Sequence, residues 1–258
     1  MTLFPVPAFR DNYIWVLSDD AGHCLVVDPG DAGPVRDYLS AAGLTPCAIL
    51  VTHHHPDHTG GVAALADQFN IPVFGPARET IPAITHPVED GDRITIPLMN
   101  MRFTVFAVPG HTLGHIAFCS EALEPPVLFC GDTLFSAGCG RLFEGTPEQM
   151  DASLQRLAAL PDATRVCCTH EYTEANLAFA LTVLPGDPAL TARAQQVGTL
   201  RAANKPSLPV DLGTEKRSNP FLRVDEPALQ AALEKETGTP LPGHVQRFAA
   251  LRAWKDRF

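Results

Sequence analysis

Residues 51–61 read VTHHHPDHTGG, a stretch that places four of the chain's ten histidines within six positions. The residues before it, CAILV, form a short apolar run typical of a buried strand. The residues after the histidines, GGVAALADQF, have the apolar spacing of a helix. The histidines therefore fall where a strand ends and a helix begins, which is where α/β proteins place their functional sites. The alternative is a solvated histidine-rich loop, and the flanking apolar segments argue against it.

The composition of the 258-residue chain excludes several classes of protein. A net charge of −10 disfavours a nucleic-acid-binding surface, because phosphate contacts need clustered Lys and Arg. No apolar stretch approaches the ~18 to 20 residues of a membrane span, and the first residues do not have the pattern of a signal peptide. The seven cysteines include no C-x-x-C pair and lie mostly in apolar runs, as thiols do in a reducing compartment. We therefore expect a cytoplasmic protein without nucleic-acid or membrane partners, and we take it to be a monomer.

As far as residue 172, strand-like apolar runs alternate with loops and helices, which predicts two sheets with helices on their outer faces. The runs are YIWVL, HCLVVD, CAILVT, PVFG, RITI, MRFTVFAVP, HIAFCS, PVLFCGD and RVCCTH. Helices are expected at 33–42, 60–69 and 147–159. The last of them begins with Thr146 as N-cap and Pro147 in its first turn.

Beyond residue 172 the pattern becomes helical. Helices are expected at 173–184, 188–203, 226–236 and 242–256. The stretch KPSLPVDLGTEKRSNPFLR (205–223) is polar and contains several prolines, so we expect it to be a loop without regular structure. The sequence therefore predicts an α/β domain at 1–172 and a small helical domain at 173–258.

The residue types in the opening motif are those that bind zinc and similar divalent metals. His53 and His55 can point the same way, since alternate residues of an extended segment share a face. Further candidates share one sequence context, an apolar strand that delivers a His or an Asp to its C-terminal end. The predicted ligands are His53, His55, Asp57, His58, His111, Asp132 and His170. Seven ligands are enough for two metal sites.

We assign these ligands to two sites that share one bridging carboxylate. One site takes His53, His55 and His111, the other takes Asp57, His58 and His170, and Asp132 bridges them. His54 should point away from the metals, and His115 is expected to make an orienting hydrogen bond. The predicted cofactors are two divalent ions, zinc first, with iron and manganese as the alternatives.

Seven stretches of the chain together resemble one known family. They are FRDNYIW, THHHPDHTGG, PGHTLGH, GDTLFSAGCGRLFEG, THEYT, KRSNPFLR and LRAWKDRF. The T-H-x-H-x-D-H pattern with a later His, Asp and His is that of the metallo-β-lactamase superfamily, and the full set is similar to glyoxalase II, the hydroxyacylglutathione hydrolases. The resemblance implies a metallo-β-lactamase-like αββα sandwich followed by a small C-terminal helical domain.

Two metal ions about 3.5–4 Å apart suit hydrolysis of an ester, amide, phosphodiester or thioester, and do not by themselves select one. The resemblance selects the thioester, S-(R)-lactoylglutathione, with D-lactate and glutathione as products. It also implies catalytic roles for Asp57 and Asp132, both metal ligands, with Asp57 also orienting the attacking water.

The glutathione end of the substrate needs fixed cations. Arg252 and Lys255 lie three positions apart on one face of the last predicted helix, although two cations near a helix C-terminus also favour the helix dipole. The resemblance implies glutathione contacts for both residues, and for Arg141 and Tyr172. It also implies a contact at Phe143, where some members of the family have a tyrosine. A substrate hydrogen bond is in doubt at that position.

Three other interpretations compete with this one. A glutathione persulfide dioxygenase would have one iron and no such helical tail. A β-lactamase is disfavoured because Asp132 stands where many of those enzymes have cysteine. A metal-stabilised binding module without turnover is disfavoured because structural zinc sites are closed and usually mononuclear.

Overall fold

The computed structural model describes residues 1–120 and 123–258. It divides into two compact units, each made of several chain segments. Unit one contains Met1–Ala107, Gly114–Gly131 and Cys167–His170. Unit two contains Val108–Leu113, Asp132–Val166 and Glu171–Phe258. The predicted division into an α/β domain at 1–172 and a helical domain at 173–258 stays a prediction.

Unit one begins with a six-stranded sheet in the order β1-β2-β3-β4-β5-β6. Its strands are β1 (Thr2–Ala8), β2 (Asn12–Ser18), β3 (His23–Val27), β4 (Thr45–Leu50), β5 (Val73–Pro76) and β6 (His86–Val88). The first three strands pair antiparallel, and β3 to β6 pair parallel. The parallel strands need crossover connections. The crossovers from β3 to β4 and from β4 to β5 carry α1 (Ala32–Ala42), α2 (Pro56–Thr59) and α3 (Val62–Phe69).

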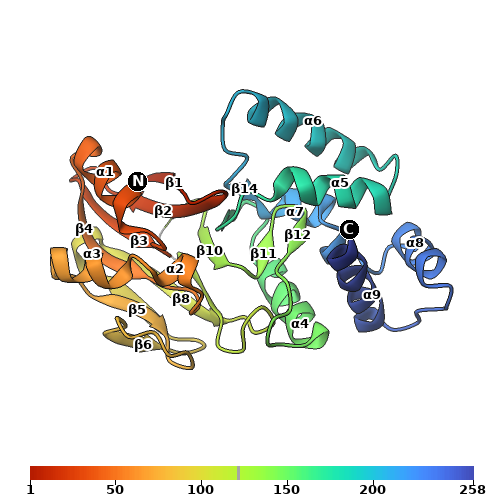
Figure 1. Ribbon diagram of the computed structural model, residues 1–258, viewed down its shortest axis with the longest axis horizontal. Helices are drawn as coiled ribbons and strands as arrows, with labels where there is room; N and C mark the ends of the chain where they lie inside the picture. The colour runs from red at the N-terminus through yellow and green to blue at the C-terminus, as the bar shows by residue number, and fades with distance from the viewer. Residues whose placement is uncertain (121–122) are drawn as a thin grey trace. The chain divides into compact units, whose positions relative to one another are not determined.

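Both faces of this sheet are buried. Ile14 and Val16 belong to an apolar cluster that includes residues of α1 and α3, the helices drawn beside the strands at the N-terminal end in Figure 1. Trp15 and Leu17, which alternate with them along β2, are also buried and point to the other face. The near-continuous apolar runs of β2 to β4 therefore reflect a sheet covered on both sides.

The second sheet of unit one is an antiparallel series in the order β10-β9-β8-β7. Its strands are β7 (Arg93–Ile96), β8 (Met101–Ala107), β9 (Ile116–Ser120) and β10 (Val127–Gly131), with the short helix η1 (Pro97–Met99) between β7 and β8. Phe103, Phe118 and Phe129 are fully buried in it. Two sheets in the first part of the chain are thus confirmed.

Unit two is mainly helical. It contains α4 (Pro147–Ala158), α5 (Thr173–Val183), α6 (Pro188–Ala202), α7 (Leu212–Ser218), η2 (Pro220–Leu222), α8 (Pro227–Thr237) and α9 (His244–Arg257), with the short strands β11 (Leu134–Phe135), β12 (Gly138–Cys139) and β14 (Val210–Asp211). β14 pairs with the first residues of β13 (Arg165–Cys168). The predicted capping of α4 is confirmed, because Thr146 Oγ1 accepts from the backbone N–H of Gln149 while the Gln149 side chain accepts from that of Thr146.

One prediction about this unit was wrong. The stretch 205–223 is not a loop without regular structure, since it forms β14, α7 and η2. Its polar residues include Glu215 and Asn219, both fully buried and hydrogen-bonded. Polar composition predicts a loop only when the polar groups face solvent, and here they have partners inside the protein.

Candidate active site

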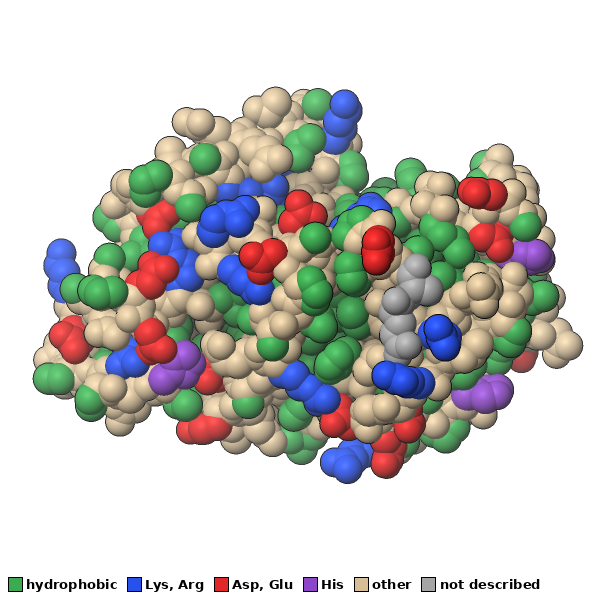
Figure 2. Space-filling view, turned by 180° about the vertical axis from the view of Figure 1, so that it is seen from behind, with side chains coloured by type: hydrophobic (Ala, Val, Ile, Leu, Met, Phe, Trp, Pro, Cys, Tyr) green, Lys and Arg blue, Asp and Glu red, His purple; other side chains and the backbone are tan. Residues whose placement is uncertain are grey.

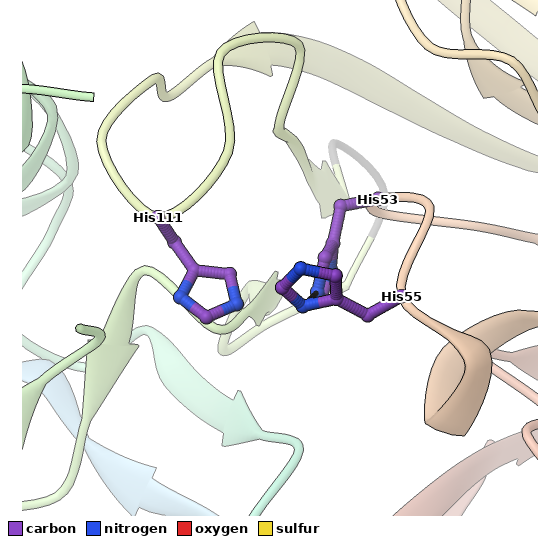
Figure 3. A group of neighbouring side chains, drawn as sticks. All are labelled: His53, His55 and His111. Carbon is purple, nitrogen blue, oxygen red and sulfur yellow. Dashed lines mark hydrogen bonds between the residues drawn. The ribbon is translucent and has the colours of Figure 1, made fainter. Parts of the chain in front are cut away.

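The histidines of the opening motif follow β4 directly, as predicted. His53 and His58 are fully buried, and His53 Nε2 lies 3.0 Å from His55 Nδ1. In Figure 3 the side chains of His53 and His55 turn toward one another from the loop after β4, and the third histidine drawn, His111, comes from the loop after β8. Asp57 and His58 lie in the four-residue helix α2, which begins four residues before the helix predicted at 60–69. Gly30 allows this packing, because a Cβ there would stand 1.8 Å from the backbone oxygen of Asp57.

A buried carboxylate that sequence reasoning missed orients this loop. Asp28 Oδ2 lies 3.1 Å from His58 Nδ1 and accepts a hydrogen bond from Thr52 Oγ1 at 2.7 Å. Its Oδ1 accepts from the backbone N–H of Thr52, also at 2.7 Å. A histidine whose Nδ1 is hydrogen-bonded in this way presents Nε2 as its ligand atom. The available signal was an aspartate directly after the strand HCLVV.

Asp57, His58 and His170 come together in unit one. Their ligand atoms all lie within 4.8 Å of one another, and Asp57 Oδ2 is 3.6 Å from His58 Nε2 and 3.4 Å from His170 Nε2. Asp11 Oδ1 lies 2.8 Å from His170 Nδ1, and Asn12 Nδ2 donates to Asp57 Oδ2 at 2.9 Å. Asp11 and Asn12 were not predicted as site residues, although both occur in the quoted motif FRDNYIW.

The two remaining histidines of this region have different partners, and the orienting hydrogen bond expected of His115 stays a prediction. His54 is directed to Glu79, with 3.1 Å between Nδ1 and Oε2. His115 is fully buried, and its ring stacks on that of His53 at a centroid distance of 4.6 Å. His115 can therefore hold His53 in place by packing.

His111 and Asp132 lie close together within unit two. His111 Nδ1 lies 2.9 Å from the backbone oxygen of Arg141, which selects the tautomer with the proton on Nδ1 and the lone pair on Nε2. That Nε2 is 3.4 Å from Asp132 Oδ2, and both residues are buried. An imidazole nitrogen and a carboxylate oxygen are thus brought together, as a metal site requires.

A cavity of about 480 Å³ in unit two contains this pair. Its lining residues are His111, Asp132, Phe135, Cys139, Arg141, Phe143, Tyr172, Ala175, Asn176, Arg252 and Lys255. All five predicted substrate-binding residues are among them. Phe135, Cys139, Ala175 and Asn176 were missed, because nothing in the sequence near them distinguishes a cavity wall from core.

The cations of the cavity stand out in a chain with a net charge of −10, in which acidic and basic side chains are interspersed over the face drawn in Figure 2. Arg252 is only 4% exposed, and its Nη1 donates to the backbone oxygen of Cys139 at 2.8 Å. Lys255 Nζ lies over the ring of Phe179, 5.1 Å from its centroid. Burial, assisted by the charge of Arg252, lowers the pKa of Lys255 to about 8. Arg141 is more exposed, with Nε 3.9 Å from Asp256 Oδ1.

The other cavity residues limit the chemistry. Burial raises the pKa of the Cys139 thiol, and the nearby Arg252 only partly opposes this, so the thiol is neutral and a poor nucleophile. Tyr172 is 37% exposed and offers a phenol to a ligand. Phe143 is 64% exposed, its backbone N–H donates to the His111 oxygen at 3.3 Å, and its ring lies 5.2 Å from the His111 ring, measured between centroids.

Comparison with known proteins agrees with this fold. Residues 8–170 match the family model of the metallo-beta-lactamase superfamily, and residues 171–258 match that of the hydroxyacylglutathione hydrolase C-terminus. The crystal structure of the BLEG-1 B3 metallo-beta-lactamase covers 86% of this chain and 99% of its own, with a TM-score of 0.66 and 26% identity. The crystal structure of TTHA1623 in a di-iron-bound form covers 85% and 100%, with a TM-score of 0.60 and 28% identity. The fold is therefore the α/β metallo-β-lactamase fold with a helical C-terminal region, as predicted.

The relationship is closer still to one family within this superfamily. The hydroxyacylglutathione hydrolase of Nitrosomonas eutropha is 49% identical over 256 residues, which are 99% of this chain and 98% of the relative. The chain belongs to the hydroxyacylglutathione hydrolases, and the resemblance found in the sequence is confirmed. The superfamily and the His/Asp clusters together indicate a dinuclear metal site. Among the residues described, no helix is long and apolar enough to cross a membrane.

Proposed function

We propose that the protein hydrolyses acylglutathione thioesters, and that S-(R)-lactoylglutathione is its substrate, with D-lactate and glutathione as products. The reaction serves methylglyoxal detoxification. The observation that carries this proposal is the cavity of unit two. His111 and Asp132 line this cavity together with Arg141, Arg252 and Lys255. A ligand pair next to three cations suits a substrate with a reactive carbonyl at one end and carboxylates at the other.

Seven side chains would hold the two metal ions. In this proposal His53, His55 and His111 bind one ion, Asp57, His58 and His170 bind the other, and Asp132 bridges both. The donor set supports it, because neutral imidazoles and carboxylates suit zinc, iron and manganese alike. The outer hydrogen bonds of His58, His111 and His170 support it too, since metal-binding histidines usually carry such a partner on the second ring nitrogen. We propose zinc as the metal.

When bound, two such ions would supply a nucleophile from water at neutral pH and polarise the thioester carbonyl. The chain's own groups orient the reactants. One oxygen of Asp57 accepts a hydrogen bond from Asn12 Nδ2. Because the Asp57 side chain is 39% exposed, the carboxylate can also accept a hydrogen bond from the attacking water. Water forms the new C–O bond, the C–S bond breaks, and glutathione leaves as the thiolate and takes a proton.

The glutathione portion binds the cations of the cavity. Arg252 and Lys255 attract a carboxylate of the tripeptide, and the Tyr172 hydroxyl can hydrogen-bond its backbone. Phe143 offers only its ring, so it contributes apolar contact. These interactions hold substrate without taking part in bond making, and their loss is expected to act mainly on KM.

The wider assignments belong to the same proposal. The domain at 1–172 carries the chemistry, and the helical domain at 173–258 binds glutathione through Arg252 and Lys255, together with Arg141, Phe143 and Tyr172 of the first domain. The enzyme acts as a monomer in the cytoplasm, and the seven buried free thiols are consistent with that compartment.

Metal content and turnover, measured on the same preparation, test the proposal. Protein reconstituted separately with Zn²⁺, Fe²⁺ and Mn²⁺ is analysed for metal, and its hydrolysis of S-(R)-lactoylglutathione is followed by thiol release. Two ions per chain and rapid thiol release are expected, with the zinc form active. One iron per chain with oxygen consumption on glutathione persulfide would instead show a dioxygenase. Two ions without turnover of any acylglutathione would show a binding module.

A further inference from the structure

The hairpin of β11 and β12 forms one wall of the cavity. Leu134 pairs with Cys139 and Phe135 pairs with Gly138, which leaves Ser136 and Ala137 as a two-residue turn. Ala137 has φ +55, in the left-handed region that a residue with a Cβ rarely adopts. A turn with this backbone conformation needs support from neighbouring groups.

Glu215 of α7 provides that support. Its side chain is fully buried, and Oε1 accepts a hydrogen bond from Ser136 Oγ at 2.8 Å. Its Oε2 accepts from the Ala137 backbone N–H at 2.7 Å. Both residues of the turn are therefore bound by one carboxylate.

Asn219, one helical turn after Glu215, binds the two hairpin residues that flank the turn. Its Nδ2 donates to the backbone oxygens of Phe135 at 3.1 Å and Gly138 at 2.9 Å, and to Glu215 Oε2 at 3.1 Å. The carboxylate and the amide together bind four consecutive residues, 135–138. These hydrogen bonds explain why the polar residues Glu215 and Asn219 of the stretch 205–223 are buried.

The hairpin in turn holds a cation of the cavity. Arg252 Nη1 donates to the backbone oxygen of Cys139, the last residue of β12, and lies 3.5 Å from its Sγ. The Arg252 Nη2 donates to Asp256, one turn further along α9. The position of the hairpin therefore fixes the position of the buried guanidinium of Arg252.

We infer that Glu215, assisted by Asn219, is a positioning residue for binding the glutathione end of the substrate. This inference rests on the proposed function. A buried carboxylate contributes little net stability, because its desolvation cost offsets most of its interactions, so holding one particular backbone conformation is the better account of its presence. Burial raises the pKa of the Glu215 carboxyl. The hydrogen bonds that it accepts from the turn and from Asn219, and the charge of the nearby Arg193, oppose this rise.

Two substitutions of different severity test the inference. Glu215→Ala removes both acceptors, so the hairpin and Arg252 shift. The KM for S-(R)-lactoylglutathione should rise by about tenfold, and so should the Kd for glutathione measured by calorimetry. A tenfold change is the lower end of the range expected for losing one charge-assisted hydrogen bond. Glu215→Gln keeps one acceptor, and the Ser136 hydroxyl can turn to accept from the new amide. It should restore most of the affinity.

The remaining measurements separate positioning from mere stability. Metal content should stay at the value of the parent, and kcat should change little. The Ala137 amide should exchange with deuterium faster in Glu215→Ala than in the parent. A thioester without the glutathione carboxylates should be hydrolysed equally by both. Asp187→Asn is the control, because it neutralises another carboxylate of the unit, 14% exposed, which binds Arg223 and caps α6.

Unchanged KM and Kd in both Glu215 variants, or an equal rise in Asp187→Asn, would overturn the inference. Failure of the proposed function is distinguishable. If the parent binds glutathione but hydrolyses no acylglutathione, the reaction is wrongly assigned, and the glutathione Kd series still decides the role of Glu215. If the parent does not bind glutathione, the inference falls with it.

Discussion

The proposed metal ligands and the cations of α9 are held in different ways. His58 lies in α2 and His170 follows β13, and each has Nδ1 within hydrogen-bond distance of a carboxylate, Asp28 or Asp11. Lys255 lies near a helix end, over an aromatic ring, and its pKa falls to about 8. The ligand side chains are thus oriented before any metal binds, whereas the charge of Lys255 changes near pH 8.

The difference reflects what each region must do. A metal site tolerates little displacement, because ligand distances are fixed to within a few tenths of an ångström. A carboxylate-binding site only has to present positive charge at hydrogen-bond distance. Changes among the ligands should therefore affect metal content and kcat, and changes among the cations should affect KM.

The largest effect is expected for Asp132→Ala. Loss of the proposed bridging carboxylate should release one or both metals and lower kcat by roughly 100- to 1,000-fold or more. Elemental analysis and initial rates measure this, and circular dichroism should show the helices intact. Asp37→Ala, at an exposed position of α1, is the control. Full metal content and parental turnover in Asp132→Ala would place the bridge elsewhere.

The next effect concerns the cations themselves. Arg252→Ala or Lys255→Ala should raise KM for acylglutathiones by about ten- to hundredfold, the scale of a charge-assisted hydrogen bond, with metal content unchanged. Arg257→Ala lies on the same helix but is exposed and pairs with Glu236, so its KM should match the parent. If KM stays normal in both cavity variants, α9 has only a structural role.

A smaller effect follows from the titration of Lys255. Its ammonium is charged below pH 8 and neutral above it, so carboxylate binding is present at lower pH and is lost as the pH rises. Since binding needs the charged form, KM should increase by about tenfold between one unit below and one unit above that pKa. Removing the Arg252 charge should move the step to higher pH. Lys255→Arg, which stays charged, should abolish it, and a step that persists in this variant would belong to another group.

The smallest effect is expected for Phe143→Tyr. The ring is largely exposed at the cavity, so a hydroxyl added to it can reach the substrate without displacing core residues. KM should fall by about two- to fivefold, the scale of one neutral hydrogen bond that is partly solvated. Phe4→Tyr, on β1, provides a comparison at an exposed ring that does not line the cavity. An unchanged or higher KM would mean that the substrate does not approach this position.

Much of the fold could be predicted from local patterns. Every predicted helix is present within a few residues, because apolar periodicity and capping residues act over one or two turns. Short strands such as β6, β11 and β12 were not predicted, since two or three residues carry no periodicity.

The sequence by itself determined which residues could bind metal, because a run of imidazoles and a carboxylate between an apolar strand and a helix has few other uses. It also identified the family, through motifs spread over the whole chain. Only the tertiary structure decided which side chains orient those ligands and which residues line the cavity. Asp11 lies 159 positions from His170, and Glu215 lies 78 positions from Ala137. Contacts between residues so far apart depend on how the elements pack, and no local pattern of residue types encodes them.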